Sequence, residues 1–246
     1  MNIAQNLKLV RWRIAEAAKR SGRDPESIKL IAVTKGVSAD AMICAFLHGV
    51  THFGENRVQE ARDKFPLVQA QLGQGWQGLT LHMIGHLQRN KVGHALKLFH
   101  TIQSVDSERL LVAIDRKCAE MGRRVQVLLQ VNVSGELTKA GFKPEELPAV
   151  LESASKLTHV EVTGLMTIAP FTQCPEEVRP VFAKLRELTQ LDPARLRELS
   201  MGMSGDFEVA VEEGATMVRI GTAIFGPRCY TRGEDQERLG MDFGSM

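Results

Sequence analysis

Hydrophobic residues near the start of the chain recur at helical spacing. Steps of three or four residues separate Ile3, Leu7, Val10 and Ile14. The pattern stops at residues 21–25, where serine, glycine, aspartate and proline favour the end of a helix. The sequence therefore predicts one helix within residues 1–26, ahead of the first strand.

From residue 27 onward, short apolar or β-branched runs alternate with helical patterns. The predicted strands cover residues 28–34, 51–53, 79–84, 101–105, 125–133, 160–168, 198–203 and 216–220. The predicted helices between them cover residues 39–47, 58–72, 88–98, 107–121, 144–156, 176–191 and 207–213. A short apolar segment around Ile224 and Phe225 follows the last strand. The run 125–133 is largely apolar, which is typical of a parallel strand covered on both faces.

Eight strand–helix units follow one another without a long linker or a low-complexity segment. This order favours an α/β fold with a single (β/α)8 TIM barrel over an open doubly wound sheet. We predict that the barrel occupies residues 27–230 and that the extra N-terminal helix covers the bottom of the barrel. Residues 231–246 are predicted to form a polar tail.

Charge and hydropathy exclude two classes of partner. The 246-residue chain has 31 Lys+Arg against 29 Asp+Glu, a formal net charge of +2, so it lacks the concentrated positive charge that nucleic-acid binding requires. Basic residues interrupt the first apolar positions, and no stretch reaches the roughly 20 apolar residues of a membrane span. We expect a cytoplasmic protein that binds neither nucleic acid nor membranes.

Cysteine and histidine spacing predicts no metal site. The cysteines lie far apart without a C-x-x-C pair, which is typical of free thiols in a reducing compartment; they are Cys44, Cys118, Cys174 and Cys229. His82 and His86 are four residues apart, but on a strand and the following turn they do not share a face as zinc ligands on a helix do. Residues 202–206 resemble the G-x-S-x-G motif of serine hydrolases, but Asp206 stands at the final glycine position, which argues against that activity.

Lys35 is the first candidate for chemistry, because active sites of TIM barrels lie where the strands end. Ile31, Val33 and Lys35 share one face of the first strand. If this face points inward, the amine stands at the barrel mouth, where partial desolvation favours the neutral nucleophile that a Schiff base requires. A surface lysine that begins a loop is the alternative interpretation.

The last two strand ends predict an anion site. Residues 200–206 combine small residues with two serine hydroxyls just before a helix, so that backbone N–H groups and the helix dipole can face an anion. Residues 219–222 (Arg-Ile-Gly-Thr) close the next strand, and loops after strands 7 and 8 commonly hold phosphate in TIM barrels. Tight turns with a helix N-cap at Ser204 or Asp206 are the alternative.

Six motifs occur in the order of the predicted strand ends. They are Lys35, Gly54-Glu55-Asn56, HMIGHLQRNK at 82–91, GLMTI at 164–168, SMGMS at 200–204 and MVRIGTAIFG at 217–226. With these motifs the chain resembles the pyridoxal phosphate homeostasis protein family (YggS/PROSC) from about residue 28 to residue 226. It departs from the family at Arg57, where an aromatic residue is more common.

The resemblance implies that pyridoxal 5′-phosphate (PLP) is held as a Schiff base on Lys35, in a barrel similar to the N-terminal domain of alanine racemase. The implied cofactor site consists of Lys35, Asn56, His86, Ser200, Met201, Ser204, Arg219, Gly221 and Thr222. The phosphate would lie on Ser200, Ser204, Gly221 and Thr222, and Arg219 would approach the pyridine nitrogen.

The resemblance also implies a role in vitamin B6 homeostasis, with an influence on amino- and keto-acid metabolism and without established catalysis. Arg219 agrees with this role, because a guanidinium cannot keep the pyridine nitrogen protonated as a carboxylate does in electron-sink enzymes. Racemisation also needs a second acid–base group, which is a tyrosine from a separate β domain in racemases, and Tyr230 is the only tyrosine here.

Three hypotheses about function stay open. We favour a monomeric PLP-binding carrier or regulator, with PLP-dependent apoenzymes as candidate partners, over an enzyme. The alternative is a racemase-like or transaminating enzyme that uses Lys35 as its base. The third is a Schiff-base lyase without a cofactor.

Overall fold

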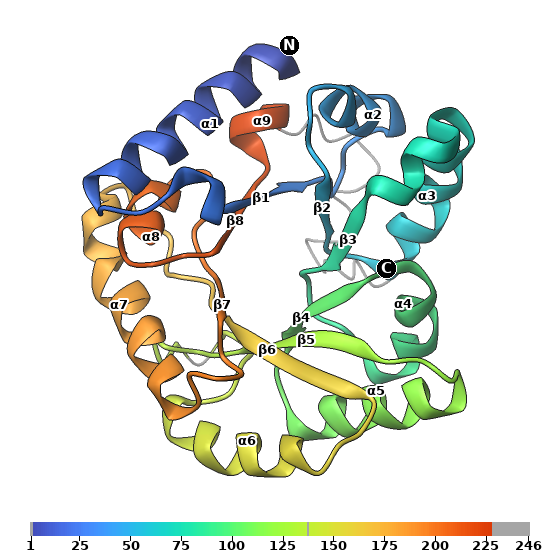
Figure 1. Cartoon of the computed structure of the whole chain (residues 1–246), viewed down its shortest axis with the longest axis vertical. Helices are drawn as coiled ribbons and strands as arrows, with labels where there is room; N and C mark the ends of the chain where they lie inside the picture. Colours follow the sequence, from blue (N-terminus) through green and yellow to red (C-terminus); the bar gives the residue numbers. More distant parts are fainter. Residues whose placement is uncertain (1, 137, 228–246) are drawn as a thin grey trace, which may run out of the picture.

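Eight parallel strands close into a barrel in chain order, with β1 beside β8 (Figure 1). The computed structural model describes residues 2–136 and 138–227; the predicted tail 231–246 and residues Cys229 and Tyr230 lie outside these ranges. The strands are β1 (Lys29–Val33), β2 (His52–Glu55), β3 (Thr80–Met83), β4 (Thr101–Val105), β5 (Val125–Gln130), β6 (Val160–Met166), β7 (Glu198–Ser200) and β8 (Met217–Ile220). The predicted (β/α)8 barrel is thereby confirmed.

Helices surround the barrel and connect its strands. They are α1 (Ile3–Arg20), α2 (Ala39–Leu47), α3 (Val58–Leu72), α4 (Val92–Leu98), α5 (Glu108–Glu120), α6 (Leu147–Ser155), α7 (Arg179–Leu188), α8 (Phe207–Glu212) and α9 (Thr222–Phe225). The predicted helices 88–98, 144–156 and 176–191 each include a 3-10 turn beside the α-helix. Two of these turns begin at Pro144 and Pro175, where the fixed proline φ suits the first turn of a helix. No helix in the described part of the chain is both long enough and apolar enough to cross a bilayer.

The N-terminal helix lies in the outer ring of helices, and the prediction that it covers the bottom of the barrel was wrong. In Figure 1, α1 runs along the outside beside α8 and α9, and it packs against α8, α9 and α2. The helix after the last strand, α9, has only four residues and cannot cover β8 and β1 alone. The apolar face of α1, with Leu7, Val10 and Ile14 buried, takes its place in the ring.

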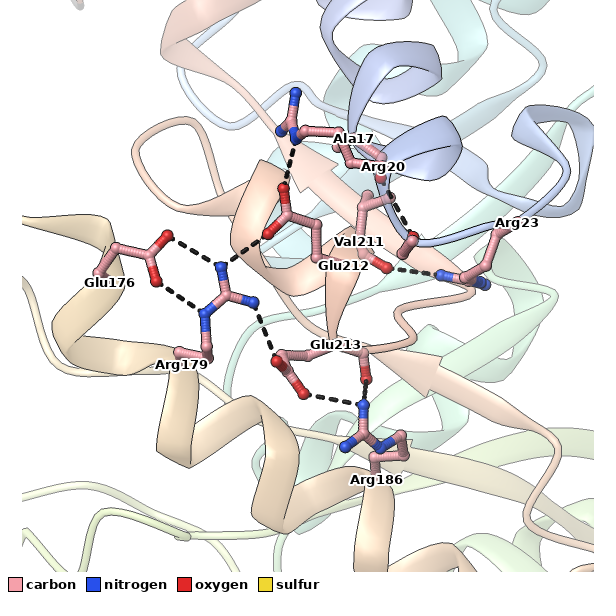
Figure 2. Close-up of polar contacts among 10 residues, drawn as sticks. Ala17, Arg20, Arg23, Glu176, Arg179, Arg186, Val211, Glu212 and Glu213 are labelled. Atoms are coloured by element: carbon pink, nitrogen blue, oxygen red, sulfur yellow. Dashed lines mark hydrogen bonds and ion pairs between the residues drawn. The ribbon is translucent and has the colours of Figure 1, made fainter.

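Charged side chains link α1 to α8, and α8 to α7 (Figure 2). Arg179 pairs with Glu176, Glu212 and Glu213 at 2.6 to 2.9 Å. Arg20 of α1 pairs with Glu212 at 2.7 Å, and Arg186 pairs with Glu213 at 2.8 Å. We call this group the outer network: Arg20, Glu176, Arg179, Arg186, Glu212 and Glu213.

The layer between strands and helices is apolar, whereas the inside of the barrel is mixed. Phenylalanine side chains fill the outer layer; they include Phe53, Phe99, Phe182 and Phe207. Inside the barrel a small apolar cluster consists of Ile31, Leu128, Met166 and Met217. Buried polar side chains lie beside it, namely His82, Gln103, Ser200 and Arg219. Polar groups deprived of water need hydrogen-bond partners, so this interior is organised by its polar contacts.

Candidate functional site

Lys35 lies in a tight turn at the carboxyl end of β1. The turn covers residues 34–37 and is closed by a hydrogen bond from the Val37 N–H to the Thr34 carbonyl oxygen (3.0 Å). Gly36 has a φ of +66°, a left-handed conformation that glycine adopts without a steric penalty. Lys35 is half-buried and stands directly beyond the strand, at the end of the barrel where TIM-barrel sites lie.

Three charged side chains hold the backbone on both sides of Lys35; we call them the Lys64 cluster, which consists of Glu55, Glu60 and Lys64. The Lys64 ammonium donates to Glu55 Oε1 (2.8 Å), to Glu60 Oε1 (2.9 Å) and to the Thr34 carbonyl oxygen (2.6 Å). Glu60 Oε1 also accepts the Gly36 N–H (2.5 Å). The residues before and after Lys35 are therefore fixed by charge-assisted hydrogen bonds from α3.

Asn56 and His86 line one cavity at the carboxyl ends of β2 and β3. The cavity has a volume of about 240 Å³ and extends to Gln130 and Asn132. Asn56 Oδ1 is buried and has no hydrogen-bond partner within the described residues. His86 is exposed, and its Nδ1 lies 2.9 Å from Asp106 Oδ2. The cavity thus contains an unused acceptor, which a bound ligand could satisfy.

Arg219 is buried inside the barrel, where it is 4% exposed. Its Nη1 donates to Ser200 Oγ (2.7 Å) and its Nη2 donates to the Thr167 carbonyl oxygen (2.8 Å). Burial lowers the pKa of Arg219 to about 10, while the nearby Asp206 carboxyl raises it. The guanidinium therefore remains a charged donor at neutral pH.

The two predicted phosphate loops lie side by side. The Ala223 N–H donates to Ser204 Oγ (3.2 Å), which joins the loop after β7 to the first turn of α9. Gly221 packs on the end of β1, since a Cβ there would lie 3.4 Å from Val33 Cβ. The segment Gly221–Thr222 is thus adjacent to the end of β1, which the Lys35 turn follows, so the predicted amine and the predicted anion loops lie at one end of the barrel.

Two further residues of the predicted site make contacts within the protein. The Ser200 hydroxyl donates to Gln103 Oε1 (2.7 Å) inside the barrel, as well as accepting from Arg219. The Met201 side chain is fully buried in the layer between strands and helices. Within the described residues, no group of three His, Cys, Asp or Glu side chains is arranged to hold a metal ion.

Comparison with known proteins places the chain in a family. A family model for the alanine racemase N-terminal domain matches residues 5–229. The pyridoxal phosphate homeostasis protein of Aquifex aeolicus is 42% identical over 234 residues, which cover 94% of this chain and 100% of that protein. The protein of the same name from Pseudomonas aeruginosa is 42% identical over 228 residues, which cover 93% and 96% of the two chains. This chain belongs to the pyridoxal phosphate homeostasis protein family.

Solved structures agree with this assignment. PipY from Synechococcus elongatus PCC7942, solved with PLP bound, superposes with a TM-score of 0.77 at 42% identity, covering 92% of this chain and 100% of PipY. A histidine racemase from Leuconostoc mesenteroides superposes with a TM-score of 0.70 at 20% identity, and the match covers 92% of this chain and 57% of the racemase. The second match shows a shared fold alone.

The sequence pattern did not identify three residues that organise the site of this homeostasis protein family member, namely Glu60, Lys64 and Gln103. In α3, Ala61, Lys64, Phe65 and Val68 share one buried face, so a lysine within an apolar face was the available signal. In β4 every residue is buried, and the Gln103 side chain contacts His82 and Ser200 inside the barrel. Buried polar side chains require hydrogen-bond partners, so a polar residue at a buried position of a helix or strand indicates a contact with another part of the fold.

Proposed function

We propose that this chain is a cytoplasmic, monomeric protein that holds PLP covalently on Lys35 as part of vitamin B6 homeostasis, without turning over a substrate. The proposal rests chiefly on one observation. The Lys35 turn, the two anion-type loops and the buried Arg219 occupy the same end of the barrel. Family membership and the PLP-bound structure of PipY support the choice of ligand.

The donor set fits PLP, which presents a dianionic phosphate, a pyridine nitrogen and polar ring substituents. Ser204, Gly221 and Thr222 offer hydroxyl and backbone N–H groups to the phosphate, in the manner of anion sites at helix starts. Arg219 offers a fixed cationic donor to the pyridine nitrogen. The unpartnered Asn56 Oδ1 and the exposed His86 complete the polar lining.

When bound, PLP supplies an aldehyde that condenses with amines and a ring that can accept electrons. The protein's part is to present the Lys35 amine, and the Lys64 cluster contributes by fixing the backbone on both sides of Lys35 through the Thr34 carbonyl and the Gly36 N–H. Arg219 would donate a hydrogen bond to the pyridine nitrogen and would keep its own proton at neutral pH, so the nitrogen would stay unprotonated. An unprotonated ring is a weak electron sink, which favours retention over catalysis.

Covalent attachment is tested by borohydride reduction and peptide mass spectrometry. We expect the added mass on the peptide that contains Lys35, and a colourless protein after Lys35→Ala. Lys156→Ala is the matched control, because Lys156 is an exposed lysine at the end of α6 that pairs with Glu152, away from the proposed site. Reproducible attachment at another lysine, with none at Lys35, contradicts the proposed site.

Ser204→Ala tests the phosphate loops. The loss of one charge-assisted hydrogen bond should weaken PLP retention by about 1–3 kcal/mol, measured as faster PLP loss during dialysis against inorganic phosphate. Ser155→Ala, at an exposed serine of α6 that bonds the Glu152 carbonyl oxygen, should leave the rate unchanged. An unaltered rate in folded Ser204→Ala means that the phosphate lies elsewhere.

The non-catalytic part is tested by proton NMR of L-alanine in deuterated water with the PLP-loaded protein. We expect the α-proton signal to persist. Rapid loss of that signal that depends on Lys35 would establish a racemase-like enzyme instead.

A further inference from the structure

A chain of hydrogen bonds crosses the inside of the barrel from Arg219 to the opposite end. It passes through one side chain on each of five strands: Arg219 (β8), Ser200 (β7), Gln103 (β4), His82 (β3) and His52 (β2). The successive distances are 2.7 Å from Arg219 Nη1 to Ser200 Oγ, 2.7 Å from Ser200 Oγ to Gln103 Oε1, 3.0 Å from Gln103 Nε2 to His82 Nδ1, and 3.0 Å from His82 Nε2 to His52 Nδ1. We call it the barrel chain.

The direction of the barrel chain is fixed at its charged end. A guanidinium only donates, so Ser200 Oγ accepts from Arg219 and gives its own proton to Gln103 Oε1. The Gln103 amide then donates to His82 Nδ1, which leaves the His82 proton on Nε2, pointing at His52 Nδ1. Every donor thus points away from Arg219, and bonds aligned in this way strengthen one another.

The far end of the barrel chain meets solvent at the amino ends of the strands. His52 is half-buried and lines a cavity of about 380 Å³ with Lys29, Arg197 and Glu198. The other four residues of the barrel chain are buried. Glu161 also lines this cavity. The barrel chain therefore connects a solvent-exposed cavity at His52 to the buried guanidinium of Arg219, near the proposed PLP site.

We propose that Gln103 and His82 are positioning residues for Arg219, and that the barrel chain couples the protonation of His52 to the hydrogen bonding of Arg219. The part that concerns PLP rests on the proposed function. A second proton on His52 places Nδ1–H against the His82 Nε2–H. To remove this clash between two N–H groups, His82 must move its proton to Nδ1 and the Gln103 amide must turn over.

Turning over the Gln103 amide disrupts the hydrogen bonding of Ser200, next to Arg219. A reversed Gln103 directs its NH2 group at Ser200 Oγ, which already accepts from Arg219. The Ser200 proton then loses its acceptor, in a position with no exposure to water. The neutral state of His52 and the observed arrangement of Arg219 therefore favour each other.

The charges around His52 act on it alongside the barrel chain. Burial lowers the pKa of His52, Lys29 on β1 lowers it further, and Glu198 on β7 raises it. Lys29 and Glu198 are themselves an ion pair. On β3, burial is the main cause that lowers the pKa of His82 to about 3, so His82 stays neutral and keeps a single proton.

The first test uses the PLP-free protein, so that it does not depend on the proposed function. Nitrogen-15 NMR of the histidine rings should show His82 with its proton on Nε2. Gln103→Glu replaces the amide by a group that only accepts, so the His82 proton should move to Nδ1 and His52 should titrate at a higher pH. Gln126→Glu is the matched control, because it adds a carboxylate at the rim of the same cavity outside the barrel chain.

In the control, His52 can respond to the added charge, but His82 should keep its proton on Nε2. A wild-type His82 that carries its proton on Nδ1, or an unchanged His82 in folded Gln103→Glu, overturns the proposal. Gln103→Met covers the case in which Gln103→Glu fails to fold. It removes the donor to Nδ1, and His82 should then populate both tautomers.

The second test measures the release of PLP. In Gln103→Met the Ser200 hydroxyl loses its acceptor and Arg219 is held less firmly, so release should be roughly fivefold faster than from the wild type. If PLP never attaches to Lys35, the proposed function fails, while the tautomer results still decide on the barrel chain. If PLP attaches and Gln103→Met releases it at the wild-type rate, Gln103 does not position Arg219.

Discussion

Two groups of charged side chains perform different tasks in this protein. In the Lys64 cluster, the side chains of Lys64 and Glu55 are 8% and 0% exposed, and the cluster contacts the backbone around Lys35. In the outer network, the Arg179 side chain is 31% exposed and bridges three carboxylates on the outside of the barrel (Figure 2). The first group holds a loop of the proposed site, whereas the second holds helices together.

Solvent exposure also separates the two groups electrostatically. Burial raises the pKa of the Glu55 carboxyl, although Lys64 opposes this effect, and Glu55 Oε2 has no hydrogen-bond partner within the described residues. On the outer wall, hydrogen bonds from Arg179 lower the pKa of Glu176. Because buried ion pairs lose much of their gain to desolvation, the Lys64 cluster is better explained by the geometry that it imposes than by the stability that it adds.

Lys64→Met should have the largest effect, because it leaves the buried Glu55 carboxyl without its cation. We expect the free energy of unfolding to fall by about 3–5 kcal/mol, measured by denaturant titration. The Thr34 carbonyl loses its partner at the same time, so the fraction of protein with PLP on Lys35 should also fall when measured below the unfolding transition. A folded Lys64→Met protein with full attachment would show that the cluster does not position Lys35.

Arg179→Met is the matched break in the outer network and should cost less. The pairs are partly exposed and screened by water, so we expect a loss of about 1 kcal/mol in the free energy of unfolding. Attachment of PLP to Lys35 should be unchanged, because α7 and α8 do not contact the Lys35 turn through this network. Reduced attachment in this variant would mean that general loosening of the fold, rather than local geometry, controls the site.

The barrel and the polar strand ends followed from the sequence because both depend on local pattern. The strand–helix alternation predicted the order of β1 to β8, and Lys35 stood out as a cation at the end of an apolar run, whereas the role of Arg219 was implied by the family resemblance. The place of α1 did not follow, because it depends on how short α9 is and thus on the gap left in the ring.

The partners of the site residues also depended on tertiary contacts. Glu60 and Lys64 are four apart, a spacing that usually marks an exposed helical pair, whereas tertiary packing of α3 buries Lys64 here. Ser200 looked like a phosphate ligand because its loop is rich in small residues. In the structure its hydroxyl donates to Gln103, 97 residues away in the chain, and no local pattern encodes that contact. The phosphate contact of Ser200 stays a prediction.

The smallest expected effect is a difference in pH dependence between the two variants. The stability lost in Arg179→Met and the stability lost in Lys64→Met should disappear at different pH values. In the Arg179 pairs, the folded pKa of Glu176 lies below its ordinary value of 4.5, so the stability that it contributes is present above pH 4.5 and is lost as the pH falls through the lowered pKa. The difference between wild type and Arg179→Met should therefore persist down to about pH 4.5 and shrink only below it.

For Lys64→Met the sign is opposite. The unpaired Glu55 carboxyl has a raised folded pKa, so its burial penalty is present at neutral pH and is relieved when the folded protein takes up a proton, above the ordinary value of 4.5. Denaturant titrations of both variants and the wild type at several pH values between about 7 and 4 test this order. If the Lys64→Met penalty also persists unchanged to pH 4.5, Glu55 is not the group that Lys64 compensates, and the contrast between the buried and the outer group loses its electrostatic basis.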